Sequence, residues 1–387
     1  MKRLMDVARQ EAPKVLTFTL LRLLADGEFH SGEVLAKQLG ISRASVNNAL
    51  RGMDSYGLTL YSIRGRGYRL VNPPQWLDAA RIGNCLGAHG KYFQIKILDS
   101  ASSSNTLLLQ QAAQGAAAGS VLAVEWQSGG RGRMGRTWHS GLGNALTFSL
   151  LWRFERGLSA LSGLSLAAGV ALMRALHALG VEGACLKWPN DVLGAHDLNG
   201  HGKDTTPDNE TRHARFPLSN FPPQAGERAN ESPREFHVKE SAKLAGILVE
   251  AQGDMLGPSA VVVGIGLNLS LPQPILRQIE QPVTSLADMK TTAPERNLLL
   301  AVLLRELHGV LCEFAQHGFA ALRAEWESYH GMQGQLVQML LPDGGRVVGT
   351  VRGVAADGSL ELETAQGMRR FNAGEISLRS GLNNVAD

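Results

Sequence analysis

The chain has 387 residues, of which 44% are hydrophobic and 19% are charged, and its formal net charge is +3. This length favours two or three domains, and the composition is ordinary for a soluble globular protein. The net charge is too small to indicate a nucleic-acid-binding protein by itself. The three cysteines are far apart and form no CxxC pair, which argues against a disulfide framework or a zinc site and favours buried thiols in a reducing compartment.

The chain shows no secretory signal and no apolar run of about 18 residues, so we expect a cytoplasmic protein without a membrane partner.

Residues 195–238 form an unusual segment within this chain. It holds five of the fifteen prolines and, between Ala195 and Phe236, no Val, Ile, Met, Trp, Tyr or Cys. Such a segment buries too little apolar surface to offset its ordering entropy, which predicts a disordered insert.

The first 72 residues are predicted to form three helices and a hairpin. Apolar side chains at near-helical spacing predict a helix over Val15–Ala25. Ser31 is placed to cap a second helix, with Val34, Leu35 and Leu39 on one face, that ends at Gly40. Ser42 is placed to cap a third helix, Arg43–Tyr56, with Val46, Leu50 and Met53 facing inward, and Leu58–Ile63 and Tyr68–Val71 then flank a basic tip. This order is typical of a winged helix-turn-helix.

The exposed face of the third helix is basic and rich in amides, with no acidic residue between Ile41 and Met53. Such side chains suit the phosphates and base edges of a DNA major groove, and arginines at the tip suit the phosphate backbone or the minor groove. A winged helix used only as a structural or protein-contact module is the alternative. The predicted DNA-binding residues are Ser42, Arg43, Ser45, Asn47, Asn48, Arg51, Arg64 and Arg66.

The central chemistry is carried by residues 127–136, with the sequence QSGGRGRMGR, which follow the apolar strand Ser120–Trp126. Glycines let a backbone approach a ligand closely, and arginines supply forked donors for phosphates and carboxylates. The spacing is neither that of a Walker loop nor that of a dinucleotide fingerprint. The segment therefore suits an enclosed anionic ligand, with a basic solvated loop as the alternative.

Three further segments place cations and an amide at strand ends: Lys187–Asp191, Lys243–Glu250 and Val261–Asn268. No Ser-His-Asp set, carboxylate pair or metal-ligand cluster stands out, so no metal-binding residue is predicted. This set of residues points to a reaction run by positioning and charge neutralisation, such as nucleotidyl transfer.

Residues 334–387 contain short strands separated by Asp-Gly turns, which predicts a small five-stranded barrel of the SH3 kind.

The motifs GGRGRMGRTW, KWPNDV, KLAGILVE, VGIGLNL and AGEISLR, in this order, closely resemble those of bacterial biotin–protein ligases. With the helix-turn-helix in front, the chain resembles the bifunctional class, which is both ligase and biotin operon repressor. The resemblance implies an α+β fold with domains at 1–72 (winged helix), 85–330 (a mixed sheet with helices, like that of class II synthetases) and 334–387 (SH3-like). It covers about residues 15–380 apart from the insert.

The resemblance also implies the activity. Such enzymes join biotin and ATP, with Mg²⁺, into biotinyl-5′-adenylate and pyrophosphate, and then biotinylate a lysine of the biotin carboxyl carrier protein of acetyl-CoA carboxylase. The adenylate-bound enzyme forms a homodimer that binds operator DNA when no acceptor is available.

Carried over by motif, the site residues fall into two groups. The implied biotin-binding residues are Ser103, Ser104, Asn105, Gln127, Arg131, Gly132, Arg133 and Lys243, of which Lys243, Arg133 and Arg131 are the implied catalytic residues. The implied nucleotide-binding residues are Arg136, Lys187, Asn190 and Asn268. Because the segment DSASSSN, residues 99–105, is longer than the family's usual form, either Ser100 or Ser103 and Ser104 make the contacts.

Three alternatives stay open at this point. The chain is a monofunctional ligase whose winged helix binds no operator, a biotin-responsive regulator with little ligase activity, or a lipoate ligase on the shared catalytic fold. Intact Arg133 and Lys243 argue against the regulator, and the glycine-arginine loop and the N-terminal module favour biotin over lipoate.

Overall fold

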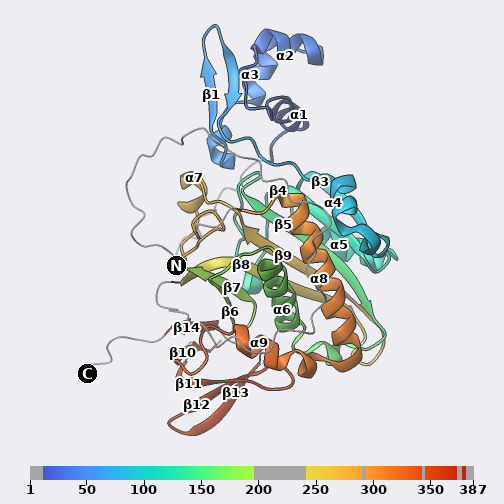
Figure 1. Ribbon diagram of the computed structural model, residues 1–387, viewed down its shortest axis with the longest axis vertical. Helices are drawn as coiled ribbons and strands as arrows, with labels where there is room; N and C mark the ends of the chain where they lie inside the picture. The colour runs from blue at the N-terminus through green and yellow to red at the C-terminus, as the bar shows by residue number, and fades with distance from the viewer. Residues whose placement is uncertain (1–11, 196–240, 290–292, 342–344, 373–376, 381–387) are drawn as a thin grey trace, which may run out of the picture.

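The computed structural model describes residues 12–195, 241–289, 293–341, 345–372 and 377–380. Three modules follow one another along its long axis, with the helical N-terminal module at one end and a small antiparallel sheet at the other (Figure 1). Most of the predicted disordered insert, residues 196–238, lies outside the described residues.

The N-terminal module contains α1 (Val15–Leu23), α2 (Gly32–Leu39), α3 (Arg43–Ala49) and the hairpin of β1 (Leu60–Ile63) and β2 (Gly67–Leu70). Ser31 and Ser42 cap α2 and α3 by accepting hydrogen bonds from the backbone amides of Glu33 and Ser45. Gly40 ends α2 at φ 64°, in the left-handed region that favours glycine. These caps confirm the predicted helix-turn-helix.

The third helix is shorter than predicted. It ends at Ala49, and a separate 3₁₀ turn covers Met53–Tyr56, because Gly52 takes a left-handed φ of 73° between them. The inward side chains predicted for a continuous helix, Val46, Leu50 and Met53, are nevertheless buried. Of the side chains predicted to share one face of α2, Leu35 is buried, whereas Val34 is 58% exposed.

A seven-stranded mixed sheet forms the centre, with strand order β3-β4-β5-β9-β8-β7-β6. Only β3 and β4 are parallel; the other neighbours are antiparallel. The strands are β3 (Gln94–Ala101), β4 (Ser120–Gln127), β5 (Ala145–Phe154), β6 (Ala184–Lys187), β7 (Asp191–Ala195), β8 (Ser241–Gly253) and β9 (Ser259–Asn268). Every residue of β9 is buried, as expected for a strand covered on both faces.

Alternate residues of these strands belong to two separate apolar clusters. Val121 and Val263 pack with α6 (Leu164–Ala178) and α8 (Arg296–His317), whereas Leu122 and Val262 pack with α5 (Ser104–Ala113). Because side chains alternate between the two faces of a strand, α6 and α8 cover one face of the sheet and α5 covers the other (Figure 1). Shorter helices complete the module: α4 (Ala79–Leu86), α7 (Gln273–Leu276), α9 (Arg323–Tyr329) and 3₁₀ turns at Gly87–Tyr92, Leu158–Leu161 and Phe319–Ala321.

The C-terminal module is a five-stranded antiparallel sheet of order β13-β12-β11-β10-β14. Its first four strands start and end within one residue of the strands that the sequence predicts at 336–341, 346–354, 359–364 and 368–371. The register shifts between Val351 and Gly353. The strands are β10 (Leu336–Leu340), β11 (Arg346–Val354), β12 (Leu360–Thr364), β13 (Gly367–Phe371) and β14 (Ser377–Ser380). Within the described residues, no helix is long and apolar enough to cross a membrane.

His330, which directly follows α9, should make the stability of the folded protein sensitive to acid. It is buried beside Trp326, and burial lowers its pKa to about 4. Because unfolded histidine titrates near 6.5, the unfolded chain takes up this proton first, and stability from neutral His330 is present above pH 6.5 and lost as pH falls toward 4. The full loss in the free energy of unfolding between these two pH values is roughly 3 kcal/mol. We expect His330→Phe to reduce it.

The measurement is the melting temperature of each variant between pH 7 and pH 4.5. His317→Gln is the control, because His317 is exposed at the end of α8. If both variants lose stability with acid as steeply as the parent, His330 does not contribute.

Candidate active site

A floor of glycines lies on the α5 side of the sheet, where β8 and β9 pair. Gly246 of β8 pairs with Gly266 of β9. Gly264 lies two residues before Gly266 on β9 and therefore on the same face of the sheet. A Cβ on Gly264 would lie 2.1 Å from Asn105 Oδ1, and one on Gly266 would lie 2.4 Å from Cε2 of Trp138. Only glycine lets Asn105 and Trp138 approach the strands this closely.

One wall of the site is a buried polar network at the start of α5. The backbone amide of Ser104 donates to Gln127 Oε1 at 2.7 Å, and Ser149 Oγ lies 2.7 Å from Ser104 Oγ and 2.5 Å from Asn105 Oδ1. The Asn105 amide donates to Leu248 O at 3.1 Å. Ser103 instead caps α5 by accepting from the amide of Thr106. Ser104 and Asn105 therefore face the site, and Ser103 orients the helix that carries them.

The glycine-arginine loop leaves β4 and crosses this wall. It is tightly turned: Gly132 N donates to Arg136 O at 2.7 Å, and Met134 takes a left-handed φ of 54° within the turn Arg133–Gly135. The Arg131 guanidinium pairs with Glu250 at 2.8 Å, and Glu250 also accepts from the Asn105 amide at 3.0 Å. The loop is thus tied to the same carboxylate as the polar wall.

A second cationic group lies at the paired ends of β7 and β8. Lys243 Nζ lies 2.7 Å from Asp191 Oδ1 and 5.9 Å from the ring centre of Trp138. Asn190 accepts from Arg133 at 3.3 Å and donates to Ile247 O at 2.9 Å. Burial lowers the pKa of the Arg133 guanidinium, and the charge of Asp191 opposes that effect. Arg133 and Lys243 therefore converge on one end of the glycine floor.

The segment between β6 and β7 is held from the C-terminal module. The indole of Trp188 donates to Gly358 O at 2.9 Å, and the Trp188–Pro189 peptide is cis. Lys187 ends β6 and helps to line a narrow hollow with Asn190 and Trp326. Ser165 and Gly169 of α6 also line this hollow, so it lies on the α6 side of the sheet.

Asn268, a predicted nucleotide contact, uses its side-chain amide to hold neighbouring backbone. Its amide is buried and donates to Thr284 O at 3.1 Å and Lys243 O at 3.4 Å. In this structure it holds the backbone that carries Lys243.

Sequence reasoning missed several residues that complete the site: Trp138, Ser149, Asp191, Glu250 and the glycines 246, 264 and 266. Most lie inside the quoted motifs, but their role depends on strand pairing that a local pattern does not reveal.

Arg136 is exposed beyond the loop turn. In the described part of the chain, no group of three or more His, Cys, Asp or Glu residues is arranged to hold a metal ion.

The predicted DNA-binding side chains lie on one module, and most of them are exposed on α3 and on the hairpin tip. Ser42 and Ser45 form the cap of α3, with Oγ atoms 2.9 Å apart. Asn47 accepts a hydrogen bond from the Tyr68 hydroxyl at 3.3 Å, and the Arg66 guanidinium lies 4.1 Å from the ring centre of Phe29. Arg43, Asn48, Arg51 and Arg64 are exposed.

Comparisons with known proteins agree with these three modules. An HTH domain model matches residues 17–69, the Biotin/lipoate A/B protein ligase family model matches residues 97–209, and the Biotin protein ligase C terminal domain model matches residues 334–379. A solved structure of the biotin protein ligase from Aquifex aeolicus has the same fold, with a TM-score of 0.53 at 23% identity over 74% of this chain and 99% of that chain. Fold and site together define a protein of the biotin/lipoate ligase class.

Relatives that match nearly end to end narrow the class further. The chain is 32% identical to the bifunctional ligase/repressor BirA of Salmonella typhimurium, over 94% of this chain and 97% of that protein. It is 31% identical to the BirA of Escherichia coli, over 93% and 96%. The chain therefore belongs to the bifunctional biotin ligase/repressor family.

Proposed function

We propose that this protein is a biotin–[acetyl-CoA-carboxylase] ligase that also represses transcription of biotin synthesis genes. The observation that carries the proposal is the convergence of Arg133 and Lys243 on one end of a glycine floor, in a chain that matches bifunctional ligases along nearly its whole length. Its substrates are biotin and ATP. We propose that magnesium enters with ATP, since Mg²⁺ is commonly held by substrate phosphates and one or two carboxylates.

In the first step, a biotin carboxylate oxygen attacks the α-phosphorus of ATP. A new C–O–P linkage forms, the bond between the α-phosphorus and the bridging oxygen breaks, and pyrophosphate leaves. Two negatively charged groups must approach each other, so neighbouring cations lower the barrier. Lys243 and Arg133 are the proposed groups, with Ser104, Asn105, Gln127 and Gly132 holding biotin and Lys187, Asn190 and Arg136 near the nucleotide.

In the second step, a lysine amine of the biotin carboxyl carrier protein attacks the acyl carbon. An amide forms, the acyl–phosphate bond breaks, AMP leaves and the amine loses a proton. The Arg131–Glu250 pair lies across the loop, with Arg131 43% exposed. We propose that this pair opens and closes as the loop encloses the adenylate, which keeps water from the reactive anhydride.

The repressor activity is assigned to the N-terminal module. The basic, amide-rich face of α3 and the arginines of the hairpin suit operator DNA, and we propose that a homodimer, formed when the adenylate is bound, presents two such faces. Action on both DNA and the carrier protein implies the cytoplasm. The alternative, a ligase whose winged helix binds no operator, predicts normal ligation without adenylate-dependent DNA binding.

The test is the intact mass of a purified biotin acceptor domain after incubation with this protein, biotin and MgATP. We expect a gain of one biotinyl group that requires ATP. A folded acceptor of unchanged mass would overturn the ligase assignment and leave a regulator alone.

A Gly264→Ala change should weaken biotin binding by at least about tenfold, or about 1.4 kcal/mol. The added Cβ would lie 2.1 Å from Asn105 Oδ1 and displace the side chain proposed to contact biotin. Biotin KM in the pyrophosphate-release assay measures the effect. Gly309→Ala is the control, because nothing lies within 4 Å of a Cβ there; equal KM values in both variants would contradict the assignment of Asn105.

A further inference from the structure

Tyr68, on the second strand of the β1–β2 hairpin, contacts both helices of the helix-turn-helix. Its side chain is only 9% exposed. A Cβ on Gly32, the first residue of α2, would lie 3.0 Å from Tyr68 Cε2, so the ring packs closely against the start of that helix. The Tyr68 hydroxyl reaches α3, where it donates to Asn47 Oδ1 at 3.3 Å. One side chain therefore links the hairpin to α2 and α3.

The backbone of Tyr68 is also held in place. Tyr68 and His30, in the loop before α2, exchange two backbone hydrogen bonds of 2.9 Å each. Gly67 permits this close approach, because it has a φ of 102° and a Cβ there would collide with His30 O. Across the hairpin, Tyr68 pairs with Ser62 of β1. The hydroxyl of Tyr68 thus has a defined position beside α3.

Asn47 lies on the exposed face of α3, where packing gives its side chain little support. A second hollow, of about 190 Å³, adjoins it between α3 and β1, and its lining includes Asn47, Arg51, Ser62 and Tyr68. Because this space is open, neighbouring side chains do not fix the conformation of Asn47 by contact. The hydrogen bond from Tyr68 restricts it instead.

The same hydrogen bond orients the Asn47 amide group. Since Oδ1 accepts from Tyr68, Nδ2 points away from that side chain, and an amide nitrogen is a donor. DNA offers acceptors to such a donor in its phosphate oxygens and, in the major groove, in N7 and O6 of guanine, N7 of adenine and O4 of thymine. A donor on the exposed face of α3 suits any of these acceptors.

We propose that Tyr68 is a positioning residue for DNA binding, whose hydroxyl holds Asn47 so that Nδ2 donates to an acceptor in DNA. The inference rests on the proposed repressor function and adds to it a residue that the sequence motifs did not single out. Asn47 is ordered before DNA arrives, so less conformational freedom is lost when the complex forms. Tyr68 itself contacts no DNA in this scheme and acts only through Asn47.

The test uses the full chain with biotin and MgATP, and a duplex that the unaltered protein selects from a randomised pool. Fluorescence anisotropy measures the affinity of that duplex for the unaltered protein, Tyr68→Phe, Asn47→Ala and the double variant. Phenylalanine keeps the ring that packs against Gly32 and removes only the hydroxyl. We expect Tyr68→Phe to weaken binding by at least about fivefold, since each subunit of a bound dimer loses one neutral hydrogen bond.

The double variant carries the decisive comparison. Asn47→Ala should weaken binding at least as much as Tyr68→Phe, and the double variant should bind as Asn47→Ala does, because the hydroxyl then has no side chain to hold. Tyr61→Phe is the matched control. It removes a phenol hydroxyl from a 50% exposed side chain on the other face of the same hairpin and should bind DNA like the unaltered protein.

Unaltered DNA affinity in Tyr68→Phe or in Asn47→Ala would overturn the inference. An equal loss from Tyr68→Phe with and without Asn47 would also overturn it, because a general loosening of the module weakens binding in both backgrounds. Failure of the unaltered protein to enrich any duplex would overturn the repressor assignment, and the inference with it. Biotin transfer to the acceptor domain, which should be the same in all variants, tests the ligase assignment separately.

Discussion

Lys243→Ala is expected to lower the rate of adenylate formation by about 10²–10³-fold, the usual cost of removing one preorganised charge from a reaction centre. Lys243 lies at the end of the glycine floor, with Nζ 2.7 Å from Asp191. Its removal leaves the Asp191 carboxylate uncompensated next to an incoming carboxylate and a phosphate. Repulsion then adds to the loss of attraction, so binding and the chemical step both weaken.

The measurement is pyrophosphate release with biotin and MgATP, with kcat and KM determined separately. Lys96→Ala is the control, since Lys96 is exposed on the edge strand β3 of the same sheet. Lys243→Arg keeps the charge at a different position and should retain more activity than alanine. Near-normal adenylate formation by Lys243→Ala would show that another group neutralises the biotin carboxylate.

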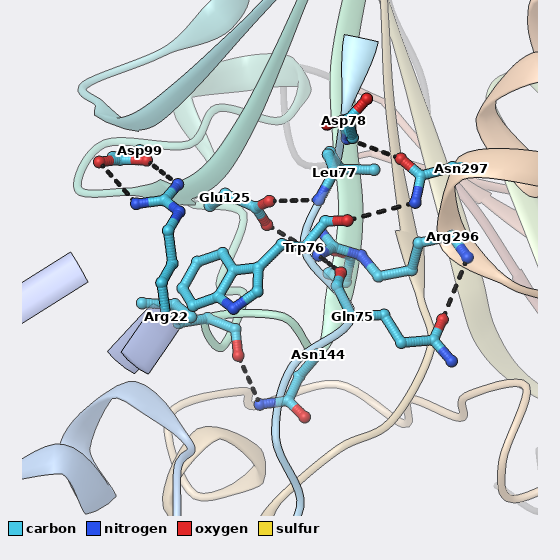
Figure 2. A network of polar contacts seen from close by, with 12 residues as sticks. Arg22, Gln75, Trp76, Leu77, Asp78, Asp99, Glu125, Asn144, Arg296 and Asn297 are labelled. Atoms are coloured by element: carbon cyan, nitrogen blue, oxygen red, sulfur yellow. Dashed lines mark hydrogen bonds and ion pairs between the residues drawn. The ribbon is translucent and has the colours of Figure 1, made fainter. Parts of the chain in front are cut away.

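Arg296→Leu is expected to lower the free energy of unfolding by about 3–5 kcal/mol, because it leaves a buried carboxylate without its partner. The side chains of Arg296 and Glu125 are 2% and 0% exposed, and their atoms approach to 2.7 Å. Arg296 also donates to Gln75 O (Figure 2) and to the buried Ala145 O, so the substitution leaves both carbonyls without this donor.

Urea denaturation followed by tryptophan fluorescence measures the change. Arg305→Leu is the matched control on the same helix, since Arg305 pairs with the neighbouring Glu306 at a half-buried surface and should cost less than about 1 kcal/mol. An Arg296→Leu protein as stable as the control variant would mean that Glu125 is protonated or hydrated rather than paired.

Local signals account for much of the N-terminal and C-terminal modules. Ser31, Ser42 and Gly40 act within one helical turn of their own positions, so the sequence reveals them directly. The same holds for the strands on either side of Asp357-Gly358. The end of α3 was predicted wrongly because apolar spacing continued to Tyr56, while the left-handed backbone at Gly52 interrupted the helix.

The sequence predicted which residue types form the candidate site, but not which of these side chains contact one another. The motifs identify Arg131, Arg133 and Lys243, but Glu250 meets Arg131 only because β4, β5, β9 and β8 are adjacent in the sheet. Likewise, the amide of Asn268 donates to the backbone carbonyls of Lys243 and Thr284, contacts that its motif alone does not reveal.

The sequence by itself determined the three modules, the helix caps and the cations, because each depends on residue type and on spacing within a few positions. The tertiary structure decided which carboxylate meets each cation and that the N-terminal part of the chain contacts the catalytic module through Arg22, Tyr56 and Leu77 (Figure 2). The physical reason is that these contacts join residues 48 or more positions apart. Their distances follow from strand register and helix packing, which no short stretch of sequence contains.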